Sequence, residues 1–349
     1  MAERMRIAFF GSGEFGVPTL HALAREHTLV GIVTQPDKPA GRGGTLTPTP
    51  IGAAAASHHP NTPLLKPLKC NLPEVVSEIR GWNADAWVVI AFGQKLGKTL
   101  LDGVFAINLH ASILPRWRGA APINAAIVGG DTHSGNSIIT LADRMDAGEV
   151  LGGSRSEIGP TETAGELHDR LSAEGPGLVL RVLAEFRSGA LTRATQDESL
   201  VTLAPKLSRA DGHVDFAVDA FTAARRINGL SPWPGVTMAL VDADGKQIDT
   251  LKLSRAALER KAVQPAHATS ESRAVASGAS SGCSVHPGTF VDAAQGIVAC
   301  AAGSTIRLID VQPAGKRIMA WPDFARGRRL SGDERLVRLP SPASPPGGT

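Results

Sequence analysis

Short apolar runs that alternate with helix-like segments dominate the first 200 residues and constrain the fold most. Met5–Gly11 is a compact apolar run that ends in glycine, and Leu29–Thr34, Ala86–Phe92 and Val104–Leu109 are further runs of this kind. Continuous apolar runs are typical of strands buried on both faces of a parallel sheet. Pro18–Glu26 lies between the first two runs and has apolar residues at helical spacing. Strands that alternate with helices predict a doubly wound, Rossmann-like α/β domain.

The pattern changes near residue 200. From there, short alternating segments such as Thr237–Val241 and Thr305–Val311 are separated by Gly, Asp and Pro, which is typical of a small antiparallel β domain. A chain of 349 residues is also long enough for two domains. We therefore expect an α/β domain over residues 4–200 and an OB-like β-barrel domain over residues 201–338. Composition predicts a mobile surface loop over residues 262–288 and a disordered tail over residues 339–349.

Charge is unevenly distributed between the two halves of the chain. Residues 1–200 carry 18 Lys or Arg and 20 Asp or Glu, whereas residues 201–349 carry 18 and 13. A basic second half favours contact with a polyanion. Chance asymmetry of solvated surface charge explains this observation equally well.

The cysteines and the apolar stretches indicate a cytoplasmic protein. Cys70, Cys283 and Cys300 lie far apart without a local cluster of histidines, so they predict neither a zinc site nor a disulfide framework. The segment after Met1 does not resemble a signal peptide, and no apolar stretch approaches the roughly 20 residues that span a bilayer. We expect a soluble, cytoplasmic and monomeric protein without a bound metal.

The glycine-rich segment Gly11–Gly16 fits G-x-G-x-x-G after the first strand, a pattern of dinucleotide-binding sites. The acidic residue expected at the end of the second strand is missing, because Thr34-Gln35-Pro36 stands there. We favour the interpretation that these glycines allow a tight turn and close packing. An NAD-dependent dehydrogenase is the alternative that this segment leaves open.

The stretch Asn108–Gly119 (NLHASILPRWRG) is the best candidate for chemistry. Asn108 and His110 are two residues apart at the end of a predicted strand, so their side chains point to the same side of it. An amide and an imidazole side by side can donate hydrogen bonds to one small carbonyl group and exchange protons with its surroundings. That pair suits acyl transfer, in which the carbonyl oxygen gains charge. Asn and His at a strand end can also be simple caps.

A second candidate stretch is Ser137–Gly148 (SIITLADRMDAG), in which an apolar strand precedes a turn with Asp143 and Asp146. A carboxylate here could orient His110 and stabilise its protonated form. Both aspartates could equally be turn formers, which is common for Asp close to Gly.

Together these two stretches resemble the folate-dependent formyltransferase family. The resemblance extends from Met5 to about Leu336, and it includes the further segments Thr34–Gly43, Ala91–Gln94, Arg226–Gly235 and Gln312–Lys316. It implies an N-terminal formyltransferase domain that uses 10-formyltetrahydrofolate as co-substrate, with neither a metal nor NAD.

The resemblance also implies the roles of individual residues. Asn108, His110 and Asp146 match the catalytic trio, and Asp146 rather than Asp143 falls where the family has its aspartate. The positions that match folate contacts are Ser112, Ile113, Leu114, Pro115, Val89, Ile90, Phe92 and Gly93. Ile113 replaces a usual Leu and Phe92 a common Tyr, and neither change affects the trio.

For the acceptor, the resemblance implies the amino group of initiator methionyl-tRNA, which is formylated for translation initiation. Thr34–Pro50 predicts a long loop without secondary structure, and long loops of this kind are often functional. The basic residues expected to contact tRNA are Lys38, Arg42, Arg225, Arg226, Lys316 and Arg317. Two tryptophans, Trp233 and Trp321, are expected in the core.

Two further alternatives remain at this point. A formyltransferase that acts on a small amine would share the Asn–His–Asp site. An RNA-binding module without catalytic activity would use the basic half alone, but it would leave the stretch Asn108–Gly119 unexplained.

Overall fold

The structure is a computed structural model that describes residues 4–40, 43–259 and 286–339. Most of the predicted surface loop and nearly all of the predicted tail lie outside the described residues, as does Arg42. The chain divides into two compact units, with the main boundary between Lys206 and Leu207. The second unit also includes residues 124–132 and 158–165 from the front half of the chain. Each unit is described by itself below.

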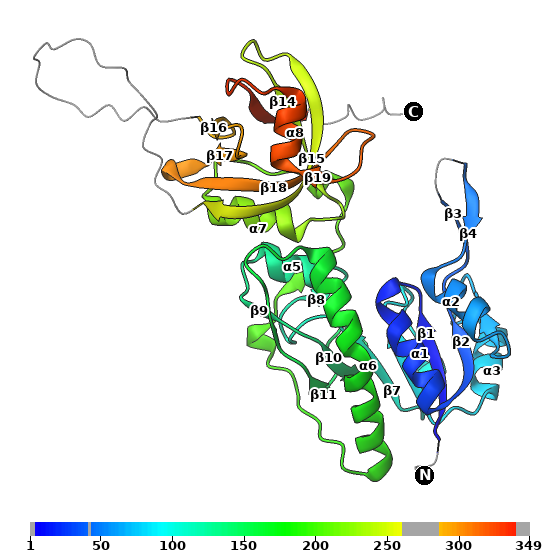
Figure 1. Ribbon diagram of the computed structural model, residues 1–349. Coiled ribbons are helices and arrows are strands. Elements are labelled where there is room, and N and C mark those ends of the chain that lie inside the picture. Colours follow the sequence, from blue (N-terminus) through cyan, green and yellow to red (C-terminus); the bar gives the residue numbers. More distant parts are fainter. Residues whose placement is uncertain (1–3, 41–42, 260–285, 340–349) are drawn as a thin grey trace, which may run out of the picture. The chain divides into compact units, whose positions relative to one another are not determined.

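The first unit contains a seven-stranded sheet in the order β11-β10-β7-β6-β1-β2-β5 (Figure 1). Five strands are parallel, and β10 and β11 are each antiparallel to their neighbours. All four predicted apolar runs form strands, which confirms the α/β prediction. The strands are β1 (Arg6–Gly11), β2 (Thr28–Val33), β5 (Leu64–Leu65), β6 (Ala86–Ile90), β7 (Ala106–His110), β10 (Ser137–Thr140) and β11 (Val150–Gly153).

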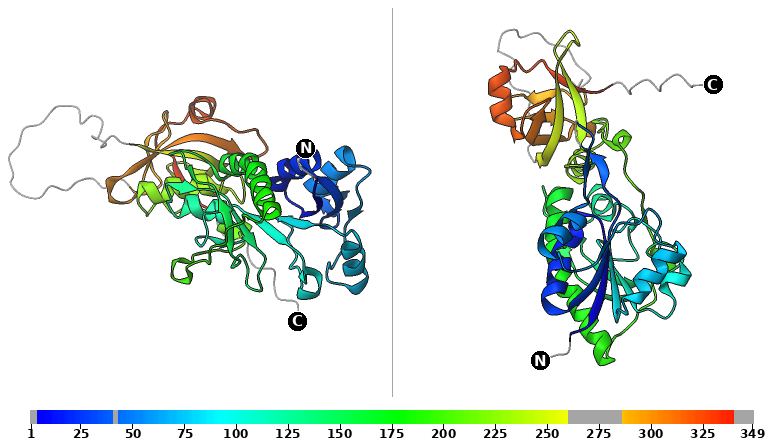
Figure 2. Two further views of the ribbon diagram at one scale, coloured as in Figure 1. Left: turned by 90° about the horizontal axis from the view of Figure 1, so that it is seen from below. Right: turned by 90° about the vertical axis from the view of Figure 1, so that its right-hand side faces the viewer.

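Helices lie on both faces of this sheet, so it is doubly wound (Figure 2, right). The predicted helix at Pro18–Glu26 is confirmed as α1 (Val17–Glu26). The longest helix, α6 (Ala164–Ser188), packs closely on β7, because a Cβ atom on Gly175 would lie only 2.8 Å from Cδ2 of Leu109. The other helices of the front half are α2 (Pro50–His58), α3 (Pro73–Gly81), α4 (Lys98–Leu101) and α5 (Pro122–Val128).

The glycine-rich turn after β1 is closely packed. A Cβ atom on Gly11 would lie 2.7 Å from Cε1 of Phe9 and 3.0 Å from the carbonyl oxygen of Ile90, and real Cβ atoms do not approach other atoms so closely. A short 3₁₀ helix, η1 (Glu14–Gly16), follows. The Ser12 hydroxyl donates to the carbonyl of Phe92 at 3.0 Å and links this turn to the segment after β6. These contacts support the packing role that we favour for the glycines.

The segment Thr34–Pro50 contains secondary structure, contrary to our expectation. Strands β3 (Lys38–Ala40) and β4 (Thr45–Thr47) form an antiparallel hairpin. Gly44 has a φ of +62° at the turn, a conformation that costs glycine little and so lets the chain reverse there.

Two short strand pairs complete the first unit. Strand β9 (His133–Ser134) pairs with β12 (Ser156–Glu157), and β8 (Arg118–Gly119) pairs in parallel with β13 (Leu203–Ala204). The second pair joins the Asn108–Gly119 stretch to the segment that leads out of the first unit.

The second unit is built around an antiparallel sheet in the order β16-β17-β18-β15-β14-β20, with β19 paired to β18. A bridge between Thr289 and Arg335 joins the two edges, and the Leu336 amide donates to the Gly288 carbonyl at 2.8 Å. The sheet therefore closes as a barrel, as predicted. Its strands are β14 (Val236–Val241), β15 (Gln247–Glu259), β16 (Phe290–Asp292), β17 (Ile297–Ala299), β18 (Thr305–Pro313), β19 (Met319–Ala320) and β20 (Arg335–Arg338).

Two helices that we did not predict, α7 (Ala220–Gly229) and α8 (Trp321–Arg328), pack against this barrel. Trp321 is fully buried, and its indole N–H donates to the Ala293 carbonyl at 2.7 Å, which confirms its predicted core position. The same prediction is wrong for Trp233, which is 51% exposed in the turn between α7 and β14. Among the helices of the described residues, none has the length and apolar character needed to cross a bilayer.

Candidate active site

Strand β7 presents Asn108 and His110 at the carboxyl end of the sheet. Asn108 pairs with Ile139 of β10, and His110 pairs with Ser137. Because the two residues are separated by one position on a strand, they share a face, as the sequence predicts. Leu109 points the other way, toward α6. Ligands bind at the carboxyl ends of strands in sheets of this class, so the pair is in the expected place for chemistry.

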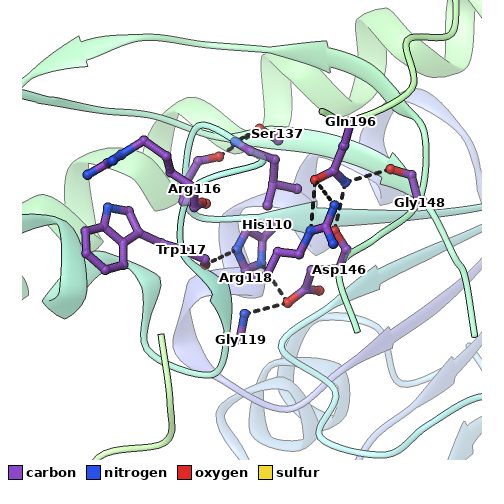
Figure 3. A network of polar contacts seen from close by, with 11 residues as sticks. His110, Arg116, Trp117, Arg118, Gly119, Ser137, Asp146, Gly148 and Gln196 are labelled. Atoms are coloured by element: carbon purple, nitrogen blue, oxygen red, sulfur yellow. Dashed lines mark hydrogen bonds and ion pairs between the residues drawn. The ribbon is translucent and has the colours of Figure 1, made fainter. Parts of the chain in front are cut away.

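The ring of His110 is held in one orientation. It is 6% exposed, and its Nε2 lies 3.0 Å from the backbone carbonyl of Trp117 (Figure 3). A carbonyl oxygen can only accept a hydrogen bond, so Nε2 carries the hydrogen. The neutral ring therefore has its lone pair on Nδ1. That atom lies 3.6 Å from Oδ2 of Asp146.

Asp146, rather than Asp143, is the aspartate that meets His110. Its Oδ2 accepts a hydrogen bond from the Gly119 amide at 2.9 Å, and its side chain is 15% exposed. Asp143 is 67% exposed instead and pairs with Lys98 at 3.3 Å. The structure therefore brings Asp146, and not Asp143, next to His110, where the residues alone left both aspartates open.

The His110–Asp146 pair is suited to accepting a proton. In the neutral ring, Nδ1 and the carboxylate oxygen are both hydrogen-bond acceptors, and 3.6 Å is too long for a direct hydrogen bond. A ligand group that carries a hydrogen can therefore donate a hydrogen bond to Nδ1 or to the carboxylate oxygen. Once Nδ1 is protonated, the adjacent carboxylate stabilises the imidazolium.

Asn108 leaves its amide available for a ligand. The side chain is partly exposed, and within the described part of the chain no hydrogen bond from it to another residue is found. An amide N–H at this position can donate to a carbonyl oxygen on the same side of β7 as Nδ1 of His110. This availability fits the donor role expected of Asn108.

The segment after β7 is folded by two serines. Ser112 is fully buried, and its hydroxyl donates to the carbonyl of Arg116 at 2.6 Å. Ser137 donates to the carbonyl of Ser112 at 2.7 Å and accepts from the amide of Leu114 at 3.1 Å. Ile113 and Pro115 are partly exposed, whereas Leu114 is buried. In the predicted folate segment, Ile113 and Pro115 thus keep accessible surface, while Ser112 shapes the loop.

The predicted folate residues on β6 and directly after it are mostly core residues. Val89, Ile90 and Phe92 are each at most 6% exposed, and Phe92 packs against Phe10 with ring centres 5.7 Å apart. Gly93 is exposed and has a φ of +82°. A ligand at this strand end would therefore meet backbone around Gly93 rather than these apolar side chains.

The predicted basic residues differ in their exposure. Lys38, Lys316 and Arg317 are exposed. Arg225 is only 8% exposed, and burial lowers the pKa of its guanidinium. Arg226 donates to the carbonyls of His213 at 2.6 Å and Asp211 at 2.9 Å. Arg226 thus has a structural role in the second unit, and little of the Arg225 guanidinium is accessible to a phosphate.

Sequence reasoning missed Arg118 and Gln196. Arg118 is 5% exposed, and its Nε and Nη2 donate to Oε1 of Gln196 at 3.0 and 2.9 Å. Gln196 in turn donates to the backbone of Asp146 at 2.8 Å (Figure 3). Arg118 stands in the quoted stretch and could have been noticed there. Gln196 lies in a segment without periodicity that gave no signal. Across the ranges that the structure describes, no group of three or more His, Cys, Asp or Glu side chains could hold a metal ion.

Comparison with known proteins gives matches over both units. The family model described as formyl transferase matches residues 5–183, and that described as formyl transferase, C-terminal domain, matches residues 206–329. Methionyl-tRNA formyltransferase from Geobacter sulfurreducens is 38% identical over 95% of this chain and 96% of its own length. The protein of the same name from Bradyrhizobium sp. (strain ORS 278) is 39% identical over 94% of this chain and 97% of its own length.

Solved structures share the fold at low sequence identity. A sugar 3N-formyl transferase, WlaRD, has a TM-score of 0.59 at 13% identity, covering 90% of this chain and 100% of its own. HypX from Aquifex aeolicus in complex with tetrahydrofolic acid has a TM-score of 0.56 at 15% identity, covering 96% of this chain and 48% of its own.

We predict that Gly119→Ala lowers turnover at least about tenfold, because small displacements of an active-site group are costly. Gly119 has a φ of +128°, and a Cβ atom there would lie 2.4 Å from the carbonyl oxygen of Ala204. The substitution must therefore displace the amide that donates to Asp146.

Gly103→Ala is the matched control. Gly103 also has a positive φ, +69°, but a Cβ atom there meets nothing within 4 Å. We expect a loss of about 1–2 kcal/mol in the free energy of unfolding from backbone strain, with normal turnover. Equal turnover of both variants would contradict the role given to the Gly119 amide.

Proposed function

The chain belongs to the formyl transferase family, and on this premise we propose that Asn108, His110 and Asp146 carry out its formyl transfer. The enzyme transfers the formyl group of 10-formyltetrahydrofolate to the amino group of methionyl-tRNA, which gives N-formylmethionyl-tRNA for translation initiation. The observation that carries the proposed site is the 3.6 Å approach of His110 Nδ1 to Asp146 beside the open amide of Asn108. We also propose that it acts in the cytoplasm, since its acceptor is a substrate of translation initiation.

Asn108 stabilises the charge that develops on the formyl oxygen. When the amine attacks the formyl carbon, the carbonyl oxygen becomes an oxyanion and requires fixed donors. The Asn108 amide is available for this because it has no partner among the described residues. Because its Nε2 donates to Trp117, His110 can add a second donor only through Nδ1, and only after Nδ1 has been protonated.

His110 moves the proton of the reaction through Nδ1. The attacking amine loses one proton as the new C–N bond forms, and Nδ1 takes this proton directly or through a water molecule. Asp146 stabilises the resulting imidazolium. Nδ1–H then donates the proton to N10 of the folate as the old C–N bond breaks, so no net proton is gained or lost. The fixed tautomer of His110 makes Nδ1 the only ring nitrogen free for both steps.

The folate is proposed to bind along the loops after β6 and β7. Ile113 and Pro115 offer partly exposed apolar surface, and the backbone at Gly93 is open to a flat ring system. Small-molecule sites typically combine apolar surface with a small number of polar groups, among them backbone N–H and C=O.

The tRNA is proposed to contact the exposed basic residues Lys38, Lys316 and Arg317. They are the accessible members of the predicted set, and Arg42 remains a prediction outside the described residues. Lys and Arg side chains bind phosphates and release counterions, so such contacts make affinity dependent on salt.

A small amine is the other acceptor that this site chemistry would accept. The relatives called methionyl-tRNA formyltransferase are similar to this chain over nearly its whole length, including both units. This similarity favours the tRNA as the acceptor. An assay of the purified protein with 10-formyltetrahydrofolate decides between them. Formylation of methionyl-tRNA well above that of glycinamide ribonucleotide supports the proposal, and the reverse order refutes it.

We predict that Asn108→Ala, His110→Ala and Asp146→Ala each lower turnover by about 10²–10³. This is the typical cost of losing one oxyanion donor, and we expect a similar cost when the group that positions or stabilises such a donor is lost. The variants should fold, as judged by thermal unfolding. Asp143→Ala is the matched control, and turnover within about twofold is expected because its exposed side chain faces solvent. Near-normal turnover of His110→Ala would remove the basis of the proton transfer described above.

For tRNA binding, we predict that Lys316→Gln combined with Arg317→Gln weakens affinity and makes it less dependent on salt. The slope of log affinity against log salt concentration should fall by about one for each lost phosphate contact. Turnover at saturating tRNA should stay the same. Arg25→Gln, at an exposed position in the first unit, serves as the charge control. An unchanged slope in the double variant would exclude these two residues from the tRNA contact.

A further inference from the structure

Gln196 connects three parts of the first unit through one buried side chain. It is 7% exposed and lies on the segment that leads toward the second unit. Its Nε2 donates to the backbone carbonyls of Asp146 at 2.8 Å and Gly148 at 2.7 Å. Its Oε1 accepts from Arg118. Figure 3 shows this amide next to the Asp146 backbone, on the side away from His110.

Arg118 fixes which way the Gln196 amide points. The two guanidinium N–H groups can only donate, so the oxygen of the amide must face them and its nitrogen must face the two carbonyls. Arg118 is itself held by Glu198 at 2.9 Å, and Glu198 also contacts Arg144 at 2.6 Å. The donor end of Gln196 is therefore aimed at the loop that carries Asp146.

That loop has a conformation that it does not favour by itself. Asp146 has a φ of +53°, in the left-handed region that residues other than glycine rarely adopt. Gly148 lies so close to β10 that a Cβ atom there would be 1.7 Å from the carbonyl oxygen of Thr140. A left-handed backbone at a residue other than glycine, as at Asp146, persists only where the surroundings hold it. The two hydrogen bonds from Gln196 act directly on these two residues.

His110 is positioned independently of Gln196. Its Nε2 donates to the Trp117 carbonyl, and the Trp117 amide donates to the hydroxyl of Thr202 at 2.9 Å. Loss of the Gln196 donors therefore leaves the imidazole in place and releases mainly the carboxylate that faces it.

We propose that Gln196 is a positioning residue that holds Asp146 against Nδ1 of His110. This inference rests on the proposed function, because it assigns Asp146 the task of stabilising protonated His110. Gln196 does not touch the reacting atoms, and it acts only through the backbone of the Asp146 loop.

The test is Gln196→Glu, measured alone and in the Asp146→Ala background with 10-formyltetrahydrofolate and methionyl-tRNA. Glutamate retains an acceptor for Arg118 but loses both donors to the loop. We expect kcat to fall by about 10- to 100-fold, within the range for a displaced active-site group, while both KM values change less than about threefold. In the Asp146→Ala background, Gln196→Glu should change kcat less than about twofold, because residues that act as a unit are not additive.

Asn228→Asp is the matched control for structural damage. Asn228 is a buried amide of the second unit that donates to the Ala256 carbonyl at 2.9 Å and accepts from the Ala256 amide at 2.8 Å. The same change from amide to acid should lower its thermal stability and leave kcat near normal. If Gln196→Glu does not fold, Gln196→Ala replaces it with the same expected results.

Two outcomes would overturn the inference. One is a kcat of the Gln196 variant within about twofold of the parent value. The other is an equal loss of kcat with and without Asp146, which would mean that Gln196 acts independently of it. By contrast, normal turnover of Asp146→Ala alone would refute the proposed catalytic trio, so the two failures can be told apart.

Discussion

The hydrogen bond from Nε2 of His110 to the Trp117 carbonyl determines what this site can do. At 3.0 Å it fixes the hydrogen on Nε2 and directs Nδ1 toward Asp146, 3.6 Å away. Without it the ring could carry its hydrogen on either nitrogen. With it, a single nitrogen can accept the amine proton and pass it on, which is the proton movement that formyl transfer from N10 to an amine requires.

The fold supports this arrangement from several sides. Strand β7 places Asn108 and His110 on one face, and the pairing of β8 with β13 positions the Gly119 amide that binds the Asp146 carboxylate. The segment after α6 adds the hydroxyl of Thr202 behind Trp117 and the amide of Gln196 behind Asp146. Residues far apart in the sequence thus hold the two groups that face Nδ1 and Nε2 of one imidazole.

Sequence patterns predicted those parts of the structure that depend on residues close together in the chain. Buried strands appear as continuous apolar runs, and a spacing of two places Asn108 and His110 on one face. The choice between Asp143 and Asp146 needed the resemblance or the structure, since both are acidic turn residues. Trp233 was misplaced because apolar character does not distinguish a core position from a turn on the surface. Gln196 could not be found, because two of its partners are backbone carbonyls that leave no mark on the sequence, and the third, Arg118, lies far away along the chain.

In the proposed reaction, one formyl group lies between the Asn108 amide and the Nδ1 side of His110. A crystal structure with a non-transferable analogue of 10-formyltetrahydrofolate tests this most directly. We expect the formyl oxygen at about 3 Å from the Asn108 amide nitrogen, with Nδ1 of His110 on the same side. A formyl group bound elsewhere, for example beside the glycine-rich turn after β1, would contradict it.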